Sequence, residues 1–335
     1  MPWLIAEFIA LLGVVFVGSL IMSIAVERLA ERWGANFAGS ILLGLVTVLP
    51  EYLIVFWAVW GGEYQGAVGS ATGAATMLMT IGFGLVIVTA TTRLSKRPVK
   101  EIKLSQTTRI DALYLFLTAM AALSLALWGG GLGLVDGAIL ALLYVAYAVH
   151  LYIEARKKSR EHHEAGRQPP RVVWALVALA ATGLLIIFVS EPFVVAMERL
   201  ADEVFHAPRL VVFFLLSPLA SEMPEKLTAF LTVHRRGALA EISVCNFIGS
   251  VVNHNSLLLG MMPFVAFFGG HSPFVPGVVV PTFWVMTCLT LIGSFSLSVG
   301  RLRRWQGWFF PALYLVQIAV TCFLSKVPPA SLPPH

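Results

Sequence analysis

The sequence predicts an all-α polytopic membrane protein with about ten transmembrane helices in two inverted five-helix repeats. One observation is the composition, because 58% of the 335 residues are hydrophobic and only 12% are charged, with a mean hydropathy of +0.83. Soluble domains carry about 25% charged residues. Another observation is a series of long apolar segments, and a third is the similarity of the two halves of the chain.

The apolar segments are long enough to cross a bilayer as helices, which takes about 20 residues each. They are continuous runs and do not alternate apolar and polar residues over about ten positions, so an outer-membrane β-barrel is not expected. The predicted spans are 4–26, 37–60, 66–91, 109–128, 132–154, 171–195, 209–232, 238–268, 277–299 and 306–324.

The lysine and arginine residues predict the orientation of these spans, because cytoplasmic connections are enriched in them. If the connections after the first, third, fifth, seventh and ninth spans face the cytoplasm, they hold all basic residues but Arg199, Arg209, Lys226 and Lys326. Both termini are then outside the cytoplasm of an integral protein of the plasma (inner) membrane. The net charge of +5 follows from this topology, so we expect a lipid bilayer and no nucleic acid as partner.

Three pairs of similar segments occur in the same order in the two halves and indicate a duplication. They are AVERLAE at 25–31 with AMERLAD at 196–202, Pro50-Glu51 with Pro224-Glu225, and DGAILALLY at 136–144 with QGWFFPALY at 306–314. Five spans per half is an odd number, so the second half must enter the membrane in the opposite orientation. Secondary transporters with inverted repeats have this organisation, with their site near the bilayer midplane.

The predicted boundaries follow from this duplication. They are a first five-helix repeat over 1–154, a basic cytoplasmic linker over 155–170 and a second five-helix repeat over 171–335.

The two Pro-Glu pairs predict a cation site. A charged side chain at the centre of a spanning helix costs about 2.5–3.5 kcal/mol on insertion scales, so such residues mark ion or substrate paths. Proline also leaves a backbone carbonyl oxygen without its helical partner. Thr47 and Ser221 precede Glu51 and Glu225 by four residues and therefore share a helical face with them. Each half thus offers a carboxylate and a hydroxyl to a hard cation, which prefers oxygen ligands.

The span that follows each pair is rich in glycine and small polar residues. In the second half, Asn246, Ser250 and His254 recur every four residues and form one polar stripe. Polar side chains inside a membrane need partners, so the stripe is expected either to face the cation site or to bond another helix in ordinary packing.

These motifs resemble those of the cation/Ca²⁺ exchanger superfamily, whose best-known members are Na⁺/Ca²⁺ exchangers. The first family signature is roughly G-T-S-L-P-E, and TVLPE at 47–51 is similar to it. A later signature, G-N-x-x-G-S-N-x-x-N, is matched by CNFIGS at 245–250 and more weakly by GSATGA at 69–74. The resemblance covers the whole chain and implies Glu51 and Glu225 as the central ion-coordinating carboxylates. The predicted ion site consists of Glu51, Glu225, Thr47, Ser221, Ser250, Glu222, Asn246 and His254.

The chain departs from the family pattern at several positions. Ala74 replaces a serine, Leu78 replaces an asparagine, and His254 replaces an acidic or amide residue. Lys226 is expected to pair with Glu222, four residues earlier, to supply a fixed positive charge near Glu225, or to extend to the membrane interface. His254 is expected either to titrate near neutral pH or to bond a neighbouring helix. These departures suggest that a proton replaces some or all of the Na⁺.

The expected function is that of a secondary-active cation antiporter that exchanges Ca²⁺ for Na⁺ or H⁺ by alternating access, with inorganic cations as partners and no cofactor. The missing first-half ligands keep an alternative open, an exchanger-fold protein that carries a different cation or acts as a sensor or scaffold. An enzyme is not expected, because the sequence has no H-E-x-x-H or G-x-S-x-G motif. The oligomeric state is not predicted.

Overall fold

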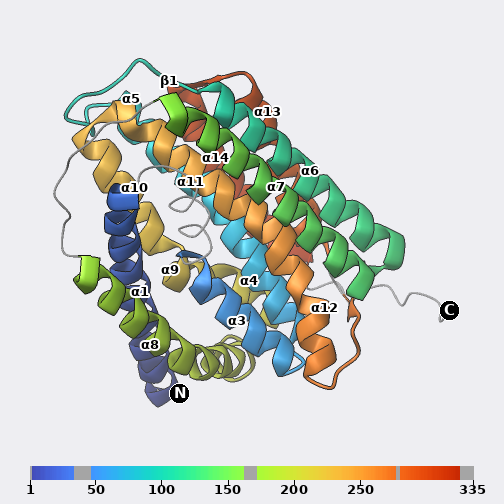
Figure 1. Cartoon of the computed structure of the whole chain (residues 1–335). Helices are drawn as coiled ribbons and strands as arrows, with labels where there is room; N and C mark the ends of the chain where they lie inside the picture. The colour runs from blue at the N-terminus through green and yellow to red at the C-terminus, as the bar shows by residue number, and fades with distance from the viewer. Residues whose placement is uncertain (1, 34–46, 162–171, 277–279, 325–335) are drawn as a thin grey trace.

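The computed structural model describes residues 2–33, 47–161, 172–276 and 280–324, and most of these residues are helical (Figure 1). The first half contains α1 (Pro2–Trp33), α3 (Leu49–Trp60), α4 (Tyr64–Met77), η1 (Leu78–Gly82), α5 (Phe83–Thr91), β1 (Glu101–Lys103), α6 (Gln106–Gly129), β2 (Gly131–Leu132) and α7 (Leu134–Glu161). The second half contains α8 (Val172–Arg199), η2 (Leu200–Phe205), α9 (Arg209–Ser221), α10 (Met223–Arg235), η3 (Gly237–Leu239), α11 (Ala240–Asn253), η4 (His254–Leu258), α12 (Leu259–Phe268), β3 (Val275–Pro276), α13 (Pro281–Ser298), β4 (Arg301–Arg303) and α14 (Arg304–Leu324).

The described residues contain eight helical segments that are long and apolar enough to cross a membrane, together with the shorter apolar helices α3 and α9. The predicted span 209–232 is two helices, because α9 ends at Ser221 and α10 begins at Met223. Pro224 lacks the N–H that would continue the helix, and proline is tolerated in a first helical turn. Of the predicted span 37–60, residues 37–46 lie outside the described residues.

The predicted linker 155–170 is partly helical, since α7 continues to Glu161. The rest of that linker lies outside the described residues.

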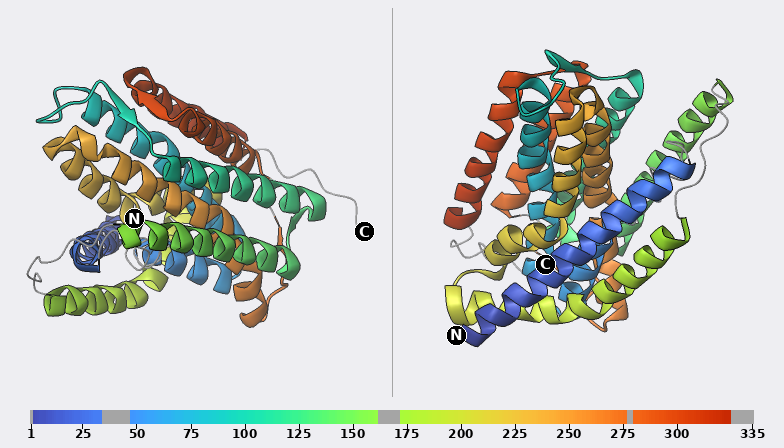
Figure 2. Two further views of the ribbon diagram at one scale, coloured as in Figure 1. Left: turned by 45° about the horizontal axis from the view of Figure 1, so that its top comes forward. Right: turned by 90° about the vertical axis from the view of Figure 1, so that its left-hand side faces the viewer.

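Two helical segments form the centre of the bundle. The most apolar window of 64–91 is 83% buried and that of 237–268 is 67% buried, whereas no other candidate span exceeds 50%. These segments consist of α4, η1 and α5 in the first half and α11, η4 and α12 in the second. Many large apolar side chains on the outer helices are exposed, as expected for a surface in contact with lipid. On one side of the bundle α1 packs along α8 (Figures 1 and 2).

Small residues allow α4 to pack closely against α9. An added Cβ at Gly69 would lie 2.4 Å from the Leu210 carbonyl oxygen, and one at Gly73 would lie 2.3 Å from the Phe214 carbonyl oxygen. Glycines at such a spacing let two helix backbones approach each other in a membrane. The glycine content of this segment is therefore required by the packing around the centre.

Gly73→Ala should destabilise the protein, because its Cβ would overlap with a backbone oxygen that cannot move without displacing α9. We expect a loss of about 1–3 kcal/mol, as for other overpacked sites, measured by thermal unfolding in detergent. Gly13→Ala is the matched control, since nothing lies within 4 Å of an added Cβ there. Equal unfolding temperatures of the two variants would contradict the close packing of α4 and α9.

Two short antiparallel ladders join the halves. The strand β1, between α5 and α6, pairs with β4, between α13 and α14. The strand β2, between α6 and α7, pairs with β3, between α12 and α13. The helix α6 leads from the first ladder to the second, whereas α13 leads from the second to the first. The two packed helices α6 and α13 therefore run in opposite directions.

The end of the bundle that carries the β1–β4 ladder is referred to as the basic end. The connections over 93–103 and 234–237 meet there, since the Lys96 N–H donates to the His234 carbonyl at 2.8 Å and the Gly237 N–H donates to the Arg97 carbonyl at 3.1 Å. The strands of the ladder add further basic residues, with Lys103 opposite Arg301. Connections predicted to be cytoplasmic thus lie together in the structure.

At the opposite end, Arg209 is surrounded by carboxylates. Its guanidinium nitrogens lie 2.6 Å from Glu63, 3.0 Å from Glu198 and 2.7 Å from Asp202. Nearby, Arg199 lies 3.0 Å from Glu203. Two of the basic residues outside the predicted cytoplasmic connections are therefore neutralised by acidic partners.

Candidate cation site

Each Pro-Glu pair lies in the first turn of a short helix. Pro50 and Glu51 are in the first turn of α3, and Pro224 and Glu225 are in the first turn of α10. The free N–H groups of a helix N-terminus favour a negative charge nearby. The sequence predicted that each proline interrupts one backbone hydrogen bond within a continuous span. In the structure each proline instead lies in the first turn of a new helix, where the free N–H groups stabilise the charge of the glutamate.

Glu51 is a buried carboxylate, with only 1% of its surface exposed. Within the described part of the chain, neither of its oxygens has a partner in hydrogen-bond geometry. Glu222 and Ser221, where α9 ends, act on it electrostatically. Because an unpartnered buried carboxylate is costly, this arrangement favours a site that a cation completes.

Glu225 is held by the polar stripe of α11. The Asn246 amide nitrogen donates to its Oε1 atom, and the Ser250 hydroxyl donates to the same oxygen at 3.4 Å. These two residues of the stripe therefore bond the glutamate of the second Pro-Glu pair, on the neighbouring helix α10. Both bonds go to the same carboxylate oxygen, and the charges of Glu222 and Lys226 also act on Glu225.

Lys226 forms a buried ion pair with Glu222. Its Nζ atom lies 3.2 Å from Glu222 Oε2 and donates to the Glu222 carbonyl at 3.1 Å, and both side chains are 1% exposed. Of the alternatives for Lys226, the pairing with Glu222 is confirmed, and extension to the membrane interface is wrong. The reason is that the end of α9 and the start of α10 lie inside the bundle, where neighbouring protein groups cover both side chains.

His254 lies on the other side of Glu222. Its Nε2 atom is 3.6 Å from Glu222 Oε1, and its Nδ1 atom bonds the Ser250 carbonyl, one turn earlier on the same helix. A carbonyl only accepts, so Nδ1 must carry a proton and Nε2 faces the carboxylate. The predicted bond of His254 to a neighbouring helix is therefore a bond within its own helix, and the contact with the neighbouring segment is electrostatic.

The two predicted hydroxyl ligands lie near the carboxylates. Ser221 is buried and donates to the Ser217 carbonyl at 3.1 Å. Ser217 in turn shares a hydrogen bond of 2.6 Å with Ser70, which ties α9 to α4. Thr47 is half-buried, one helical turn before Glu51. The structure thus gathers the eight predicted site residues around the starts of α3 and α10.

The two halves contribute unequally to this site. Ala74 and Leu78 stand where the second half has Ser250 and His254, and both are buried. At the start of the short helices, Val48 in the first half corresponds to Glu222 in the second. No group of three or more His, Cys, Asp and Glu side chains among the described residues is arranged to hold a metal ion. The polar side chains gathered here are the carboxylates Glu51, Glu222 and Glu225 with Lys226, His254 and hydroxyl and amide groups, and most of them come from the second half.

Sequence reasoning missed two features of the centre. One is a π-helical turn in each central segment, η1 starting at Leu78 and η4 starting at His254; such turns are frequent at functional sites. The other is Asn253, whose amide oxygen accepts a 2.6 Å hydrogen bond from Tyr52 of α3. The polar run Asn253-His254-Asn255-Ser256 within an apolar helix was the signal that indicated more than the single stripe.

Comparisons with known proteins agree with this arrangement. The model of the sodium/calcium exchanger protein family matches residues 3–153 and 174–323, one match in each half. An uncharacterized membrane protein of Methanocaldococcus jannaschii, MJ0091, is 23% identical over 314 residues, which cover 92% of this chain and 95% of that protein.

Two solved structures have the same fold. The H⁺/Ca²⁺ exchanger CAX aligns with a TM-score of 0.77 and 22% identity, covering 96% of this chain and 85% of the other. The sodium-calcium exchanger NCX_Mj aligns with a TM-score of 0.67 and 22% identity, covering 95% of this chain and 98% of the other.

Proposed function

Because the chain belongs to the sodium/calcium exchanger family, we propose that it is a secondary-active antiporter that exchanges Ca²⁺ for Na⁺ or H⁺ by alternating access. The observation that supports this proposal most directly is the pair of buried glutamates, Glu51 and Glu225, each at the start of a short helix in the bundle centre. Short helices that start or end inside the membrane are typical of ion sites in secondary transporters.

The two carboxylates would bind the transported cation together with nearby oxygens. Glu51 has no hydrogen-bond partner within the described residues, and Glu225 is oriented by Asn246 and Ser250. Ca²⁺ takes six to eight oxygen ligands in flexible geometry, so Thr47 and Ser221 are assigned as additional ligands. Glu222 is neutralised by Lys226, and we assign it the role of holding Lys226 and facing His254.

A proton is proposed to replace at least part of the Na⁺ as counter-ion. Multiple Na⁺ sites need many oxygen ligands, but Ala74 and Leu78 place apolar side chains at two such positions. The ammonium group of Lys226 also occupies the space beside Glu222 with a fixed positive charge. A carboxylate that takes up a proton needs no additional oxygen ligands, so exchange of Ca²⁺ for H⁺ suits the unequal halves.

The two halves are proposed to span the membrane as inverted five-helix repeats, over 1–154 and 171–335, joined by the basic linker 155–170. The ladders β1–β4 and β2–β3 support the inversion, because each joins the connection after the third span of one half to the connection after the fourth span of the other. The basic end would then face the cytoplasm of the plasma (inner) membrane, with both termini outside.

Cysteine labelling can test this orientation. In a background without the native cysteines, Lys103→Cys at the basic end should react with a membrane-impermeant maleimide only after the cytoplasmic side is opened. Ser272→Cys, which is exposed at the opposite end, should react in intact cells. The reverse pattern, or labelling of both from one side, would overturn the proposed topology. The cysteines replaced by alanine are Cys245, Cys288 and Cys322.

The proposed exchange is tested by Ca²⁺ uptake into proteoliposomes, driven in turn by an imposed pH gradient and an imposed Na⁺ gradient. We expect uptake with the pH gradient and a smaller effect of the Na⁺ gradient. Uptake that is driven by the Na⁺ gradient but not by the pH gradient would overturn the assignment of the proton as counter-ion. If monodisperse protein shows no uptake with either gradient, the proposal of Ca²⁺ exchange is overturned.

The buried Lys226–Glu222 pair supports one alternative function, in which the fold carries a different cation or acts as a sensor or scaffold. A fixed ammonium in the site lowers its affinity for a divalent ion, because like charges repel strongly in a low-dielectric interior. This alternative predicts cation binding or a structural role without Ca²⁺ flux under either gradient.

A further inference from the structure

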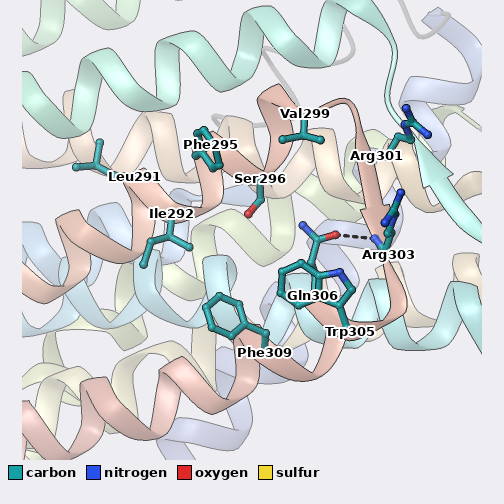
Figure 3. A pocket seen from close by; sticks show the side chains of 10 residues that line it. All are labelled: Leu291, Ile292, Phe295, Ser296, Val299, Arg301, Arg303, Trp305, Gln306 and Phe309. Carbon is teal, nitrogen blue, oxygen red and sulfur yellow. Dashed lines mark hydrogen bonds between the residues drawn. The ribbon is translucent and has the colours of Figure 1, made fainter.

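A groove between α13 and α14 lies away from the cation site and has a volume of about 660 Å³. Its walls are mainly apolar, with Leu291, Ile292 and Phe295 on α13 and Phe309 on α14, and its mouth at the basic end carries Arg301 and Arg303 (Figure 3). Pockets that hold a small molecule measure about 300–1,000 Å³, so the groove is large enough for a ligand.

The groove extends from the end of the bundle into the apolar part of the helices. From Val299, which follows the last residue of α13, back to Leu291 the groove extends over eight residue steps, which corresponds to about 12 Å at 1.5 Å per residue. One leaflet of the hydrocarbon core is about 15 Å thick. An apolar chain in the groove would therefore lie within a single leaflet, with its polar end at the arginines.

The arginines at the mouth are available to an external anion. Within the described part of the chain, Arg301 has no carboxylate partner, and Arg303 has only a distant one, with 3.9 Å between its Nε atom and Glu101 and 63% of its side chain exposed. On the other side of α13, a second groove of about 290 Å³ is lined by Arg109, whose guanidinium packs against Gly300. Both grooves share Phe295, which is 74% exposed.

We infer that the α13–α14 groove binds an anionic phospholipid, with its phosphate on Arg301 and Arg303 and one acyl chain along Leu291, Ile292 and Phe295. Guanidinium groups bind phosphate through two parallel hydrogen bonds, and basic pockets between spanning helices bind the headgroups of anionic lipids. The combination of an apolar groove with exposed arginines at one end matches the amphipathic form of such a lipid. A soluble anion would leave the apolar groove unexplained, and a neutral lipid would leave the arginines at its mouth unexplained.

Native mass spectrometry of the delipidated full chain can test this inference independently of transport. Phosphatidylglycerol and phosphatidylcholine with identical acyl chains are titrated separately. We expect the first to bind about tenfold more tightly, which is about 1.4 kcal/mol, and Arg301→Gln/Arg303→Gln to remove this preference. Arg235→Gln/Arg236→Gln is the matched control, because these residues are exposed at the basic end on another connection.

A further variant tests the apolar part of the site. Ile292→Trp should fill the groove and weaken the binding of both lipids, while thermal unfolding shows that the protein is folded. Equal affinities for the two lipids, or an unchanged preference in the Arg301/Arg303 variant, would overturn the inference. Displacement of the lipid by glycerol 3-phosphate at equal concentration would also overturn it, because the site would then be one for soluble phosphate.

Discussion

Glu51→Gln and Glu225→Gln should each abolish gradient-driven Ca²⁺ uptake into proteoliposomes. Both carboxylates are buried at the start of a short helix in the bundle centre, and glutamine removes the negative charge while it keeps the size of the side chain. If each carboxylate contributes about 3 kcal/mol to ion binding, the loss is on the order of 100-fold, since about 1.4 kcal/mol corresponds to a factor of ten.

The two substitutions should differ in their effect on the surrounding contacts. Glu225 accepts hydrogen bonds from Asn246 and Ser250, and a glutamine oxygen can accept the same bonds. Glu51 has no such partners among the described residues, so its replacement by glutamine removes an unpaired buried charge. We therefore expect Glu51→Gln to raise the unfolding temperature in detergent more than Glu225→Gln does.

Glu203→Gln is the matched control for both substitutions. Glu203 is a glutamate with 53% of its side chain exposed, and it pairs with Arg199 at the end opposite the basic end. Solvent screens an exposed pair, so uptake and stability should be close to those of the wild type. Full uptake by either the Glu51 or the Glu225 variant would contradict the assignment of these carboxylates as ion ligands.

Features carried by single residues in an apolar context could be predicted from the sequence. The glutamates in the two Pro-Glu pairs are conspicuous because a charge within a spanning helix is costly, and the structure places both in the bundle centre. The stripe of Asn246 and Ser250 could be predicted because an i, i+4 spacing defines one helical face. In these cases composition and spacing alone decide where a side chain lies.

Features that depend on tertiary packing could not be predicted in the same way. A proline pattern is compatible with a kinked helix or with two helices, and only the neighbours of α9 and α10 decide that the chain breaks before Met223. The π-helical turns at Leu78 and His254 have no periodic signal, since each is a local change of one turn. The ladders pair two or three residues from connections far apart in the sequence, which no local pattern indicates.

The environment of Lys226 is the most consequential of these unpredicted details. An i, i+4 spacing to Glu222 allows a pair, but a long side chain can equally extend to the interface. Burial of both side chains to 1% exposure decides for the pair. Each group is then dependent on the other, because a single charge without a partner is strongly unfavourable in a low-dielectric interior.

Lys226→Met should therefore destabilise the protein strongly. The methionine fills the space of the lysine stem but leaves the Glu222 carboxylate buried without its partner, and breaking a buried pair in this way costs about 3–5 kcal/mol. Glu222→Gln/Lys226→Met should recover most of this loss, because both charges are removed together. Thermal unfolding in detergent, with wild type and both single variants, measures the coupling between the two residues.

Arg199→Met provides the comparison for this cycle, because the Arg199–Glu203 pair is exposed and solvent screening leaves it little effect on stability. A Lys226→Met protein as stable as the wild type would contradict a buried pair, as would a double variant no more stable than the single one. Uptake by Glu222→Gln/Lys226→Met, which should be stable, also tests whether the ion pair is required for transport. Because removal of both charges of the pair leaves the net charge of the site unchanged, Ca²⁺ uptake by the double variant should persist and should still depend on Glu51 and Glu225.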